Sequence, residues 1–266
     1  MITDDQPLLL LDTGVGGLSV YNSLRALQPT APIIYAADYS GLPYGTKSEA
    51  EIAARVPAIL GRLVERYAPQ IVTIACNTAS TIALEHVRSA LSTPVVGTVP
   101  AVKPAAEMTK SGVIGLLGTE ATIRQPYVDR LHEIHGPDTL LLRHGAPDLV
   151  EPAEAKVRGE VVDMQILSEA LAALRDQPRG NEIDVIILAC THFPLLRDEL
   201  ASLLPDNIAL IDGADGIARR IVYLAGDRQW PKTATGNRFV TTGDKALLKP
   251  YIPHLQQLGL STFEEL

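Results

Sequence analysis

Short apolar runs alternate with longer segments of helical period along most of the chain. The first apolar run, at residues 8–11, ends at Asp12, a helical segment follows at 17–27, and a second apolar run comes at 32–38. Short buried strands that alternate with helices are typical of a parallel sheet covered by helices on both faces. The pattern therefore predicts an α/β fold.

The same pattern predicts the remaining elements. Further strands are expected at 71–75, 95–97, 113–118, 139–143, 183–189 and 208–212. Helices are expected at 49–67, 78–91, 121–135, 163–174, 195–203 and 216–225.

The strongest internal feature is a partial repeat. Residues 71–78 read IVTIACNT and residues 185–192 read VIILACTH, so each is an apolar run that ends in Ala-Cys and leads into a helix. Ligands of open α/β sheets bind outside the carboxyl ends of the strands, where Cys76 and Cys190 would both lie. We therefore predict two similar doubly wound parallel-sheet domains that face each other across a central cleft, with one thiol on each wall.

Two crossovers set the predicted domain boundaries. The segment 98–104 contains two prolines in seven residues and is predicted to connect the two halves. The last predicted strand and helix, from residue 208 onward, are expected to return the chain to the first half. The first domain is thus predicted at 1–98 plus 208–266, and the second at 99–207.

Composition and charge narrow the class of protein. The chain has 266 residues, 46% of them hydrophobic, which suffices for two domains with their own cores. A net charge of -8 gives no attraction toward phosphate backbones or anionic lipids, so neither nucleic acid nor membrane is an expected partner. The acidic N-terminus and the short apolar run after it fit neither a signal peptide nor a membrane span, so we expect a cytoplasmic protein.

The two cysteines, Cys76 and Cys190, are candidates for proton transfer. Reduced thiols are the default in the cytoplasm, so a disulfide is not expected. A thiol at a helix N-terminus has a lowered pKa, because the helix dipole and free N–H groups favour the thiolate. Either cysteine alone is more simply explained as a small buried hydrophobe. The matched pair of strand ends favours a chemical role.

The glycine-rich turn after Asp12 opens a helix, and its N–H groups are expected to form a seat for a carboxylate or phosphate. Gly14, Gly16 and the later Asp38 also fit a dinucleotide-binding fingerprint, although Ser19 stands where the third glycine belongs. The Asp12 carboxylate would repel a pyrophosphate and better suits a substrate ammonium or the orientation of a thiol. Asp12 as a simple helix cap stays an alternative.

Other strand ends carry weaker signals. The turn after Asp38 offers a carboxylate and the phenol of Tyr44, or is simply an ordinary turn. Thr119 and Thr122 either cap a helix or hold an anion. His192 follows Cys190 by two residues and is suited to act as an acid or an orienting group.

Metal and phosphate motifs are lacking. A zinc site of Cys76, Cys190 and His192 is an alternative, but the usual spacing of zinc ligands is absent, so no metal is expected. The sequence contains neither a P-loop nor a nucleophile elbow.

Taken together, these motifs resemble those of the glutamate racemases, within the wider group of aspartate and glutamate racemases. The resemblance extends over nearly the whole chain and is specific because the motifs occur together. It is carried by DTGVGG at 12–17, PYG at 43–45, ACNTAS at 75–80, GTEAT at 118–122 and ACTHFP at 189–194. Thr13 departs from the serine usual in the family but keeps the hydroxyl.

The resemblance implies which residues form the site. Cys76 and Cys190 would be the acid/base pair, with Asp12 assisting Cys76. His192 and Glu154 would assist Cys190, and Glu151 is the alternative to Glu154. The implied substrate-lining residues are Asp12, Thr13, Asp38, Pro43, Tyr44, Gly45, Asn77, Thr78, Thr119, Thr122, Thr191 and His192. The first predicted domain would then carry Asp12, Tyr44 and Cys76, and the second Thr119, Thr122, Glu154, Cys190 and His192.

The resemblance also implies an activity, namely the interconversion of L- and D-glutamate by two-base proton transfer without a cofactor. In the family pattern Cys76 deprotonates the D form and Cys190 the L form, and D-glutamate supplies peptidoglycan synthesis in a bacterial cytoplasm. Some family members form dimers and some respond to a cell-wall precursor, so a second copy and such a regulator are expected partners besides glutamate.

Rival hypotheses stay open on the sequence alone. An aspartate racemase and a hydantoin racemase would share the two-thiol geometry. A nicotinamide-binding oxidoreductase or sensor is the alternative from another class, and a purely structural interaction protein is a third.

Overall fold

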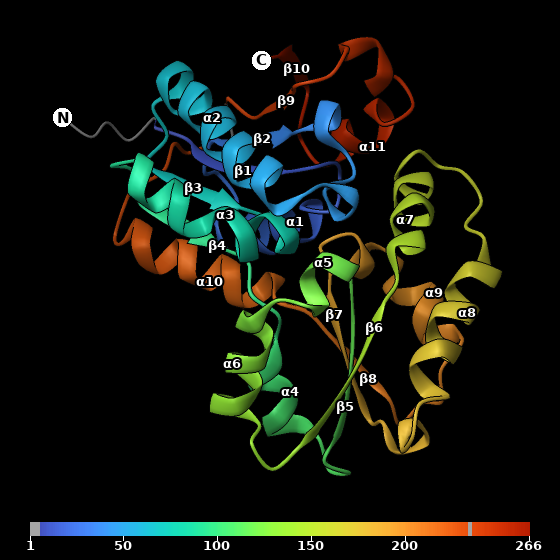
Figure 1. Cartoon of the computed structure of the whole chain (residues 1–266). Coiled ribbons are helices and arrows are strands. Elements are labelled where there is room, and N and C mark those ends of the chain that lie inside the picture. Colours follow the sequence, from blue (N-terminus) through green and yellow to red (C-terminus); the bar gives the residue numbers. More distant parts are fainter. Residues whose placement is uncertain (1–5, 234–235) are drawn as a thin grey trace.

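Two parallel sheets, each covered by helices, make up the molecule (Figure 1). The structure is a computed structural model of the chain and describes residues 6–233 and 236–266, so the predicted first domain includes a few positions, 1–5 and 234–235, outside the described residues. Every strand pairing in the described residues is parallel. The predicted fold class, two parallel-sheet α/β units, is confirmed.

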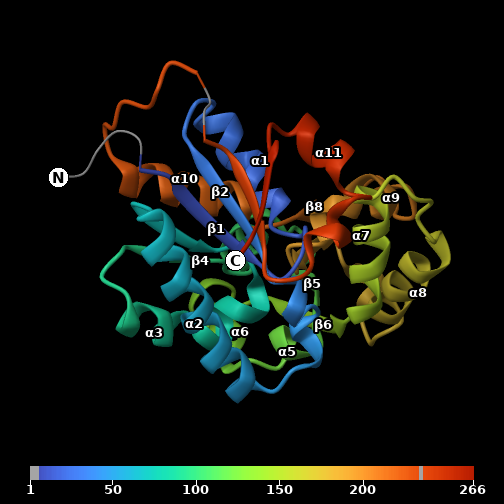
Figure 2. The same ribbon diagram turned by 90° about the horizontal axis from the view of Figure 1, so that it is seen from above.

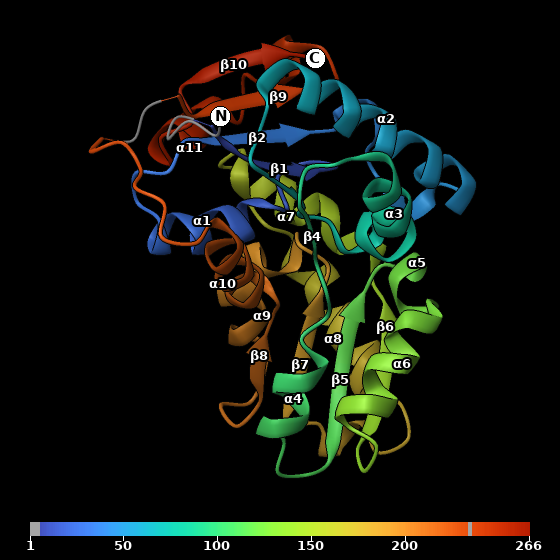
Figure 3. The ribbon, with the colours of Figure 1, turned by 90° about the vertical axis from the view of Figure 1, so that its left-hand side faces the viewer.

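The first sheet has the strand order β10-β9-β2-β1-β3-β4. Its strands are β1 (Leu8–Asp12), β2 (Ile33–Ala37), β3 (Ile71–Ile74), β4 (Val95–Gly97), β9 (Arg238–Thr241) and β10 (Thr262–Glu265). Side chains alternate between its faces, since Leu8 and Leu10 join one core while Leu9 and Leu11 join another. Helices α1 (Leu18–Leu27) and α10 (Ala214–Ala225) cover the first face, and α2 (Glu49–Tyr67) and α3 (Asn77–Ala90) the second (Figure 3).

The second sheet has the strand order β6-β5-β7-β8. Its strands are β5 (Val113–Gly118), β6 (Leu140–Gly145), β7 (Val185–Ala189) and β8 (Ala209–Ile211). One face is covered by α4 (Val102–Met108) and α6 (Pro126–His135), and the other by α8 (Met164–Arg175) and α9 (Arg197–Ser202).

Helix α7 (Val150–Val157) lies between the two units and packs against both (Figures 1 and 2). Ala153 packs into the core of the second sheet, whereas Val157, one turn later, packs into the core of the first. Arg158, directly after the helix, donates a hydrogen bond to Tyr251, which precedes α11 (Ile252–Gln257) in the first unit. The position of α7 therefore depends on both units.

Several element boundaries differ from those predicted. The helix predicted at 121–135 is two helices, α5 (Glu120–Ile123) and α6, because Pro126 lacks the N–H that a continuous helix needs. The last three residues of the predicted crossover at 98–104 are helical, since α4 begins at Val102. The strands β9 and β10 and the helices α4, α7 and α11 were not predicted.

The predicted return to the first unit comes too early. Strand β8 pairs with β7 in the second sheet, so a boundary at residue 208 would detach it from its own sheet. The chain crosses back only after Ile211 and enters α10, which packs on the first sheet. The remaining domain boundaries stay predictions. Among the described helices, none combines the length and the apolar character needed to cross a membrane.

The C-terminal strands should contribute strongly to the first core. Phe239 in β9 is fully buried and its ring stacks on Tyr35 with centroids 5.3 Å apart. We expect Phe239→Ala to lower the free energy of unfolding by about 3 to 5 kcal/mol, because it leaves a cavity in a packed core. Urea denaturation measures this loss, with the exposed Leu247→Ala as control, for which about 0.5 kcal/mol or less is expected. Equal losses in the two variants would contradict this assignment.

Candidate active site

The carboxyl ends of the two sheets meet, and the predicted site residues gather there. Strand β1 ends at Asp12, and β7 leads directly into Cys190 and Thr191. The Thr191 hydroxyl, from the second unit, donates to Oδ2 of Asp12, from the first, at 3.3 Å. Both thiols are buried, with Cys76 7% and Cys190 6% exposed. Asn77, which directly follows Cys76, lines one small cavity together with Cys190 and Thr191, so the two cysteines border the same buried region.

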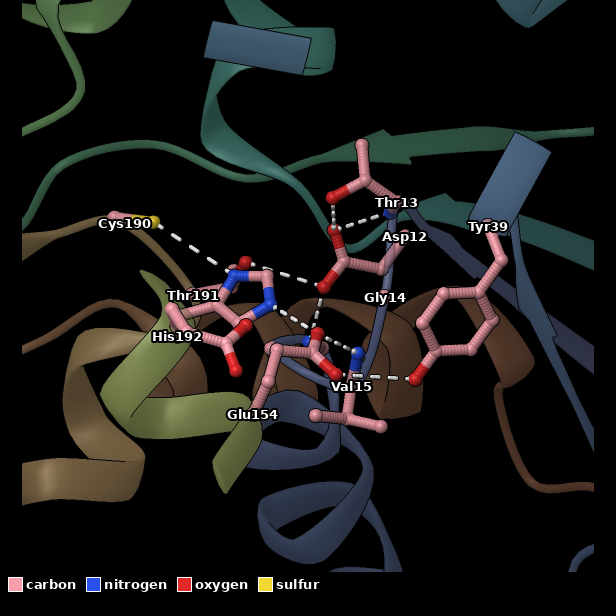
Figure 4. Close-up of polar contacts among 12 residues, drawn as sticks. Asp12, Thr13, Gly14, Val15, Tyr39, Glu154, Cys190, Thr191 and His192 are labelled. Carbon is pink, nitrogen blue, oxygen red and sulfur yellow. Dashed lines mark hydrogen bonds and ion pairs between the residues drawn. The ribbon is translucent and has the colours of Figure 1, made fainter. Parts of the chain in front are cut away.

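Cys190 stands at the end of a three-residue chain of polar contacts (Figure 4). Its Sγ lies 4.0 Å from Nδ1 of His192, and Nε2 of the same ring contacts Oε1 of Glu154 at 2.8 Å. His192 and Glu154 are 3% and 1% exposed. Glu151, the alternative partner, instead forms an exposed ion pair with Arg158.

The His192–Glu154 pair favours the charged form of both groups. Burial opposes the charge on His192, but the hydrogen bonds to Cys190 and Glu154 outweigh it and raise the pKa of the imidazole well above its usual value. Burial likewise opposes the charge on Glu154, yet the hydrogen bond from His192 lowers the pKa of this carboxyl below its usual value. An imidazolium therefore faces the Cys190 sulfur.

Cys76 has a different environment. It occupies the position just before α3, and the Ala79 N–H does favour its thiolate. Burial and the nearby charge of Asp12 outweigh that hydrogen bond and raise the pKa of the thiol well above its usual value. The expected lowering of the pKa by the helix N-terminus is therefore wrong for Cys76 in this structure. Cys190 precedes no α-helix, since a 3-10 helix, η5 (Phe193–Leu196), follows it.

The glycine-rich turn does hold carboxylates, and they belong to the protein. The Thr13 and Gly17 N–H groups donate to Asp12, and the Val15 N–H donates to Oε1 of Glu154 at 3.1 Å. Burial raises the pKa of Asp12, while the charge of His192 and these N–H groups act in the opposite direction.

Gly14 and Gly16 permit the two units to touch. A Cβ on Gly14 would collide with the Glu154 carboxylate, and one on Gly16 would lie 2.7 Å from the backbone nitrogen of His192. Since His192 and Glu154 cover these glycines, the turn has no open face for a pyrophosphate at that point. The glycine pair that favoured a dinucleotide site therefore serves to bring the two units together instead.

Threonine hydroxyls form a second contact between the units. Thr78, in the first turn of α3, shares a hydrogen bond of 2.9 Å with Thr119 and one of 3.3 Å with Thr122. Thr119 also caps α5, accepting from the Thr122 N–H at 3.1 Å. The same threonines thus cap a helix and hold the two units together. Asn77 precedes Thr78 and is also buried.

Asp38 is already saturated by protein groups. Its carboxylate accepts from Arg55 Nε at 2.5 Å and Nη2 at 2.6 Å, from the Tyr44 hydroxyl at 2.6 Å and from the Thr242 hydroxyl at 2.5 Å. Burial opposes its charge, but these donors lower the pKa of Asp38 below its usual value. Its position favours a role in holding Tyr44 over direct contact with a substrate.

A cavity of about 770 Å³ adjoins the turn at Pro43 and Gly45 and is large enough for an amino acid, but neither Cys76 nor Cys190 is among its lining residues. Four of the predicted residues, Pro43, Gly45, Thr119 and Glu154, line it. Gly45 and Thr119 come from opposite units and lie near each other, since a Cβ on Gly45 would be 3.5 Å from Thr119. Both units therefore contribute to the cavity wall.

The zinc alternative has no ligand set, because residues 6–233 and 236–266 contain no group of three potential metal-binding side chains.

Residues that the sequence did not single out also reach the site. The Tyr39 hydroxyl donates to Oε2 of Glu154 at 3.1 Å, and Tyr251 contributes to lowering the pKa of this carboxyl. Tyr39 directly follows a strand-end aspartate, which was a usable signal, whereas nothing in the sequence near Tyr251 marked it.

Comparisons with known proteins agree with this geometry. The sequence profile of the Asp/Glu/Hydantoin racemase family matches residues 16–221. A glutamate racemase from Sphingopyxis alaskensis is 60% identical over 260 residues, which cover 98% of this chain and 97% of that protein. A glutamate racemase from Pectobacterium carotovorum is 42% identical over 263 residues, covering 97% and 90%.

Solved structures give the same result. The Escherichia coli glutamate racemase, in complex with L-glutamate and the activator UDP-MurNAc-ala, matches with a TM-score of 0.90 and 39% identity, covering 98% of both chains. An aspartate racemase from Picrophilus torridus matches with a TM-score of 0.55 and 18% identity, covering 86% of this chain and 96% of that one. The second likeness shows a shared fold only.

The packing of the glycine turn can be tested directly. We expect Gly16→Ala to destabilise the protein by about 1 to 3 kcal/mol, because the new methyl group lies against the His192 backbone, which has little room to move. The matched control is Gly61→Ala in α2, whose Cβ meets nothing within 4 Å and which should be neutral or slightly stabilising. Thermal unfolding measures both, and an unchanged stability of Gly16→Ala would contradict the close contact.

Proposed function

The chain belongs to the Asp/Glu/Hydantoin racemase family, among its glutamate racemases, and on that premise we propose that it interconverts L- and D-glutamate with Cys76 and Cys190 as two opposed bases and without a cofactor. One observation carries this proposal. Two buried thiols follow strand ends of facing sheets, and each has its own acidic or basic partner, Asp12 for one and the His192–Glu154 pair for the other.

Inversion of an α-carbon needs a proton acceptor on one face and a donor on the other. With L-glutamate, the Cys190 thiolate takes the α-proton and the electron pair of the C–H bond moves into the carbanion and its carboxylate. The Cys76 thiol then gives its proton to the opposite face, which yields D-glutamate. The reverse reaction exchanges the two roles.

The two thiols have opposite electrostatic partners, which suits a reaction with one acceptor and one donor. The raised pKa of His192 places an imidazolium beside Cys190, whereas burial and the charge of Asp12 raise the pKa of the Cys76 thiol. In the L-to-D direction Cys76 is thus suited to donate a proton, and Cys190 accepts one next to a positive charge.

The substrate's charged groups have matching partners. The buried Asp12 carboxylate suits the ammonium group, and the hydroxyls and amide of Thr13, Asn77 and Thr191 suit the α-carboxylate and the charge that develops on it. The side-chain carboxylate would lie toward Gly45, Thr119 and Thr122. Asp38 and Pro43 would support this seat, with Asp38 acting through Tyr44.

By family role, we further propose that the D-glutamate serves peptidoglycan synthesis and that an anionic cell-wall precursor regulates the enzyme. A second cavity, of about 920 Å³, lies where the segments that connect the two sheets run, and both Lys103 and Gly213 line it. Arg88, Arg219 and Arg220 also line it and supply positive charge for a diphosphate. The Escherichia coli relative was solved with the activator UDP-MurNAc-ala, a ligand of this kind.

The two-base proposal predicts that either Cys76→Ser or Cys190→Ser abolishes racemisation while the fold persists. A serine hydroxyl is far less acidic than a thiol and does not replace it as a base. Racemisation is followed by circular dichroism of L- and D-glutamate, and the fold by the far-ultraviolet spectrum. A serine variant that racemises at the normal rate would refute the role of that cysteine.

Proton exchange tests the cofactor-independent mechanism. In deuterated buffer without added cofactor, we expect solvent deuterium at the α-carbon of the product, detected by NMR. L-aspartate and a hydantoin serve as substrate controls and should react much more slowly. Faster exchange of aspartate or hydantoin would favour those rival activities, and the absence of exchange with glutamate would reject the proposal.

The regulator proposal predicts that UDP-MurNAc-Ala binds to the purified protein and that Arg220→Ala weakens binding about tenfold, because one cation near the diphosphate is lost. Isothermal titration measures the affinity. Arg62→Ala removes an exposed arginine of α2 outside this cavity and is the matched control. Equal affinities in the two variants would place the ligand elsewhere.

A further inference from the structure

The Glu154 carboxylate is held by groups from both units. His192, from the second unit, contacts Oε1 at 2.8 Å, and the Val15 N–H, from the first unit, donates to the same oxygen at 3.1 Å. The Tyr39 hydroxyl, also from the first unit, donates to Oε2 at 3.1 Å (Figure 4). Tyr39 thus holds the second oxygen of Glu154, whereas His192 and Val15 hold the first.

Tyr39 has the properties of a fixed donor. Burial, followed by the charge of Glu154, raises the pKa of Tyr39 well above its usual value, so the hydroxyl keeps its proton. A buried carboxylate stays charged only if donors replace the water it has lost. The Tyr39 hydroxyl is one of the few groups available to do this.

Tyr251 and Arg158 hold the ring of Tyr39 in place. The rings of Tyr39 and Tyr251 lie 5.7 Å apart, and Arg158 donates to the Tyr251 hydroxyl at 3.1 Å. Arg158 follows α7, the helix that also carries Glu154. The tyrosines of the first unit and the helix that bridges the two units therefore form one packed cluster.

We propose that Tyr39 is a positioning residue for proton transfer at Cys190. Its hydroxyl keeps Glu154 an anion turned toward His192, and His192 in turn stabilises the Cys190 thiolate. Tyr39 thereby supports one of the two thiols and not the other, because Cys76 is paired with Asp12. This inference rests on the proposed two-base function and adds to it a group that acts on one half-reaction.

Tyr39→Phe tests the inference while keeping the ring. The matched control is Tyr67→Phe, which removes a hydroxyl that likewise donates to a glutamate, Glu264 at 2.6 Å, at another place in the first unit. We expect kcat/KM of Tyr39→Phe to fall about tenfold, and equally in both directions because a racemisation has an equilibrium constant of one. Tyr67→Phe should keep the wild-type value.

Isotope effects then identify the affected step. With α-deuterated L-glutamate, deuterium moves to Cys190, so the isotope effect should increase in Tyr39→Phe. With α-deuterated D-glutamate, deuterium moves to Cys76, so the isotope effect should decrease, because the later transfer from Cys190 has become more limiting. A merely structural loss would change the two isotope effects alike, and that result would overturn the inference.

A double-mutant cycle tests the route through Glu154. If Tyr39 acts through this carboxylate, Tyr39→Phe should have little further effect in a Glu154→Gln background. A further tenfold loss in that background would overturn the inference. Circular dichroism spectra confirm that the variants are folded at the assay temperature.

The outcome is separable from that of the two-cysteine mechanism. If Cys76→Ser and Cys190→Ser both abolish racemisation and Tyr39→Phe behaves as Tyr67→Phe does, the proposed function stands and the role of Tyr39 is rejected. If either cysteine proves dispensable, the proposed function itself fails first.

Discussion

Two carboxylates, Asp12 and Glu154, are buried against one glycine-rich turn, and the site depends on how that turn satisfies them. Buried carboxylates need donors, and here backbone N–H groups of Thr13, Val15 and Gly17 supply them. Glu154 arrives from the other unit, so the turn joins the units as well as solvating the charges. Side chains at positions 14 and 16 would keep the units apart, which explains why the turn is rich in glycine.

The two halves are alike in backbone but differ in electrostatics. Each thiol directly follows an alanine at or just after a strand end, yet one lies beside an acid and the other beside an imidazolium. A symmetric pair of sites would give both thiols the same electrostatic surroundings, whereas a two-base reaction needs one acceptor and one donor. The difference arises from Asp12 and His192, and neither belongs to the part that the two repeats share.

The sequence predicted what depends on local pattern and missed what depends on packing. The strand ends at Asp12 and before Cys190 follow from short apolar runs. That both lie at the site follows from the rule that ligands of open α/β sheets bind outside the carboxyl ends of the strands. Helix α7 is only eight residues long and contains Pro152, so its periodicity is too short to read. Strands β9 and β10 have only four residues each, too few for a clear alternation. The prediction placed β8 with the wrong unit, because strand pairing is a tertiary property.

The turn after Asp12 shows that the sequence also could not predict which anion the turn would bind. Its composition predicted a seat for an anion, and the structure fills part of that seat with the protein's own carboxylates. Which anion occupies such a turn is decided by what the rest of the fold brings to it, here a helix more than a hundred residues away in the chain.

Because that helix is packed against both cores, any change in the relative position of the two units moves Glu154 away from Val15 and Tyr39. The cavity of about 920 Å³ lies along the segments that connect the units, so a ligand there would act on the same geometry. Catalytic readiness at Cys190 and docking of the two units are therefore one property of this fold, joined at a single carboxylate.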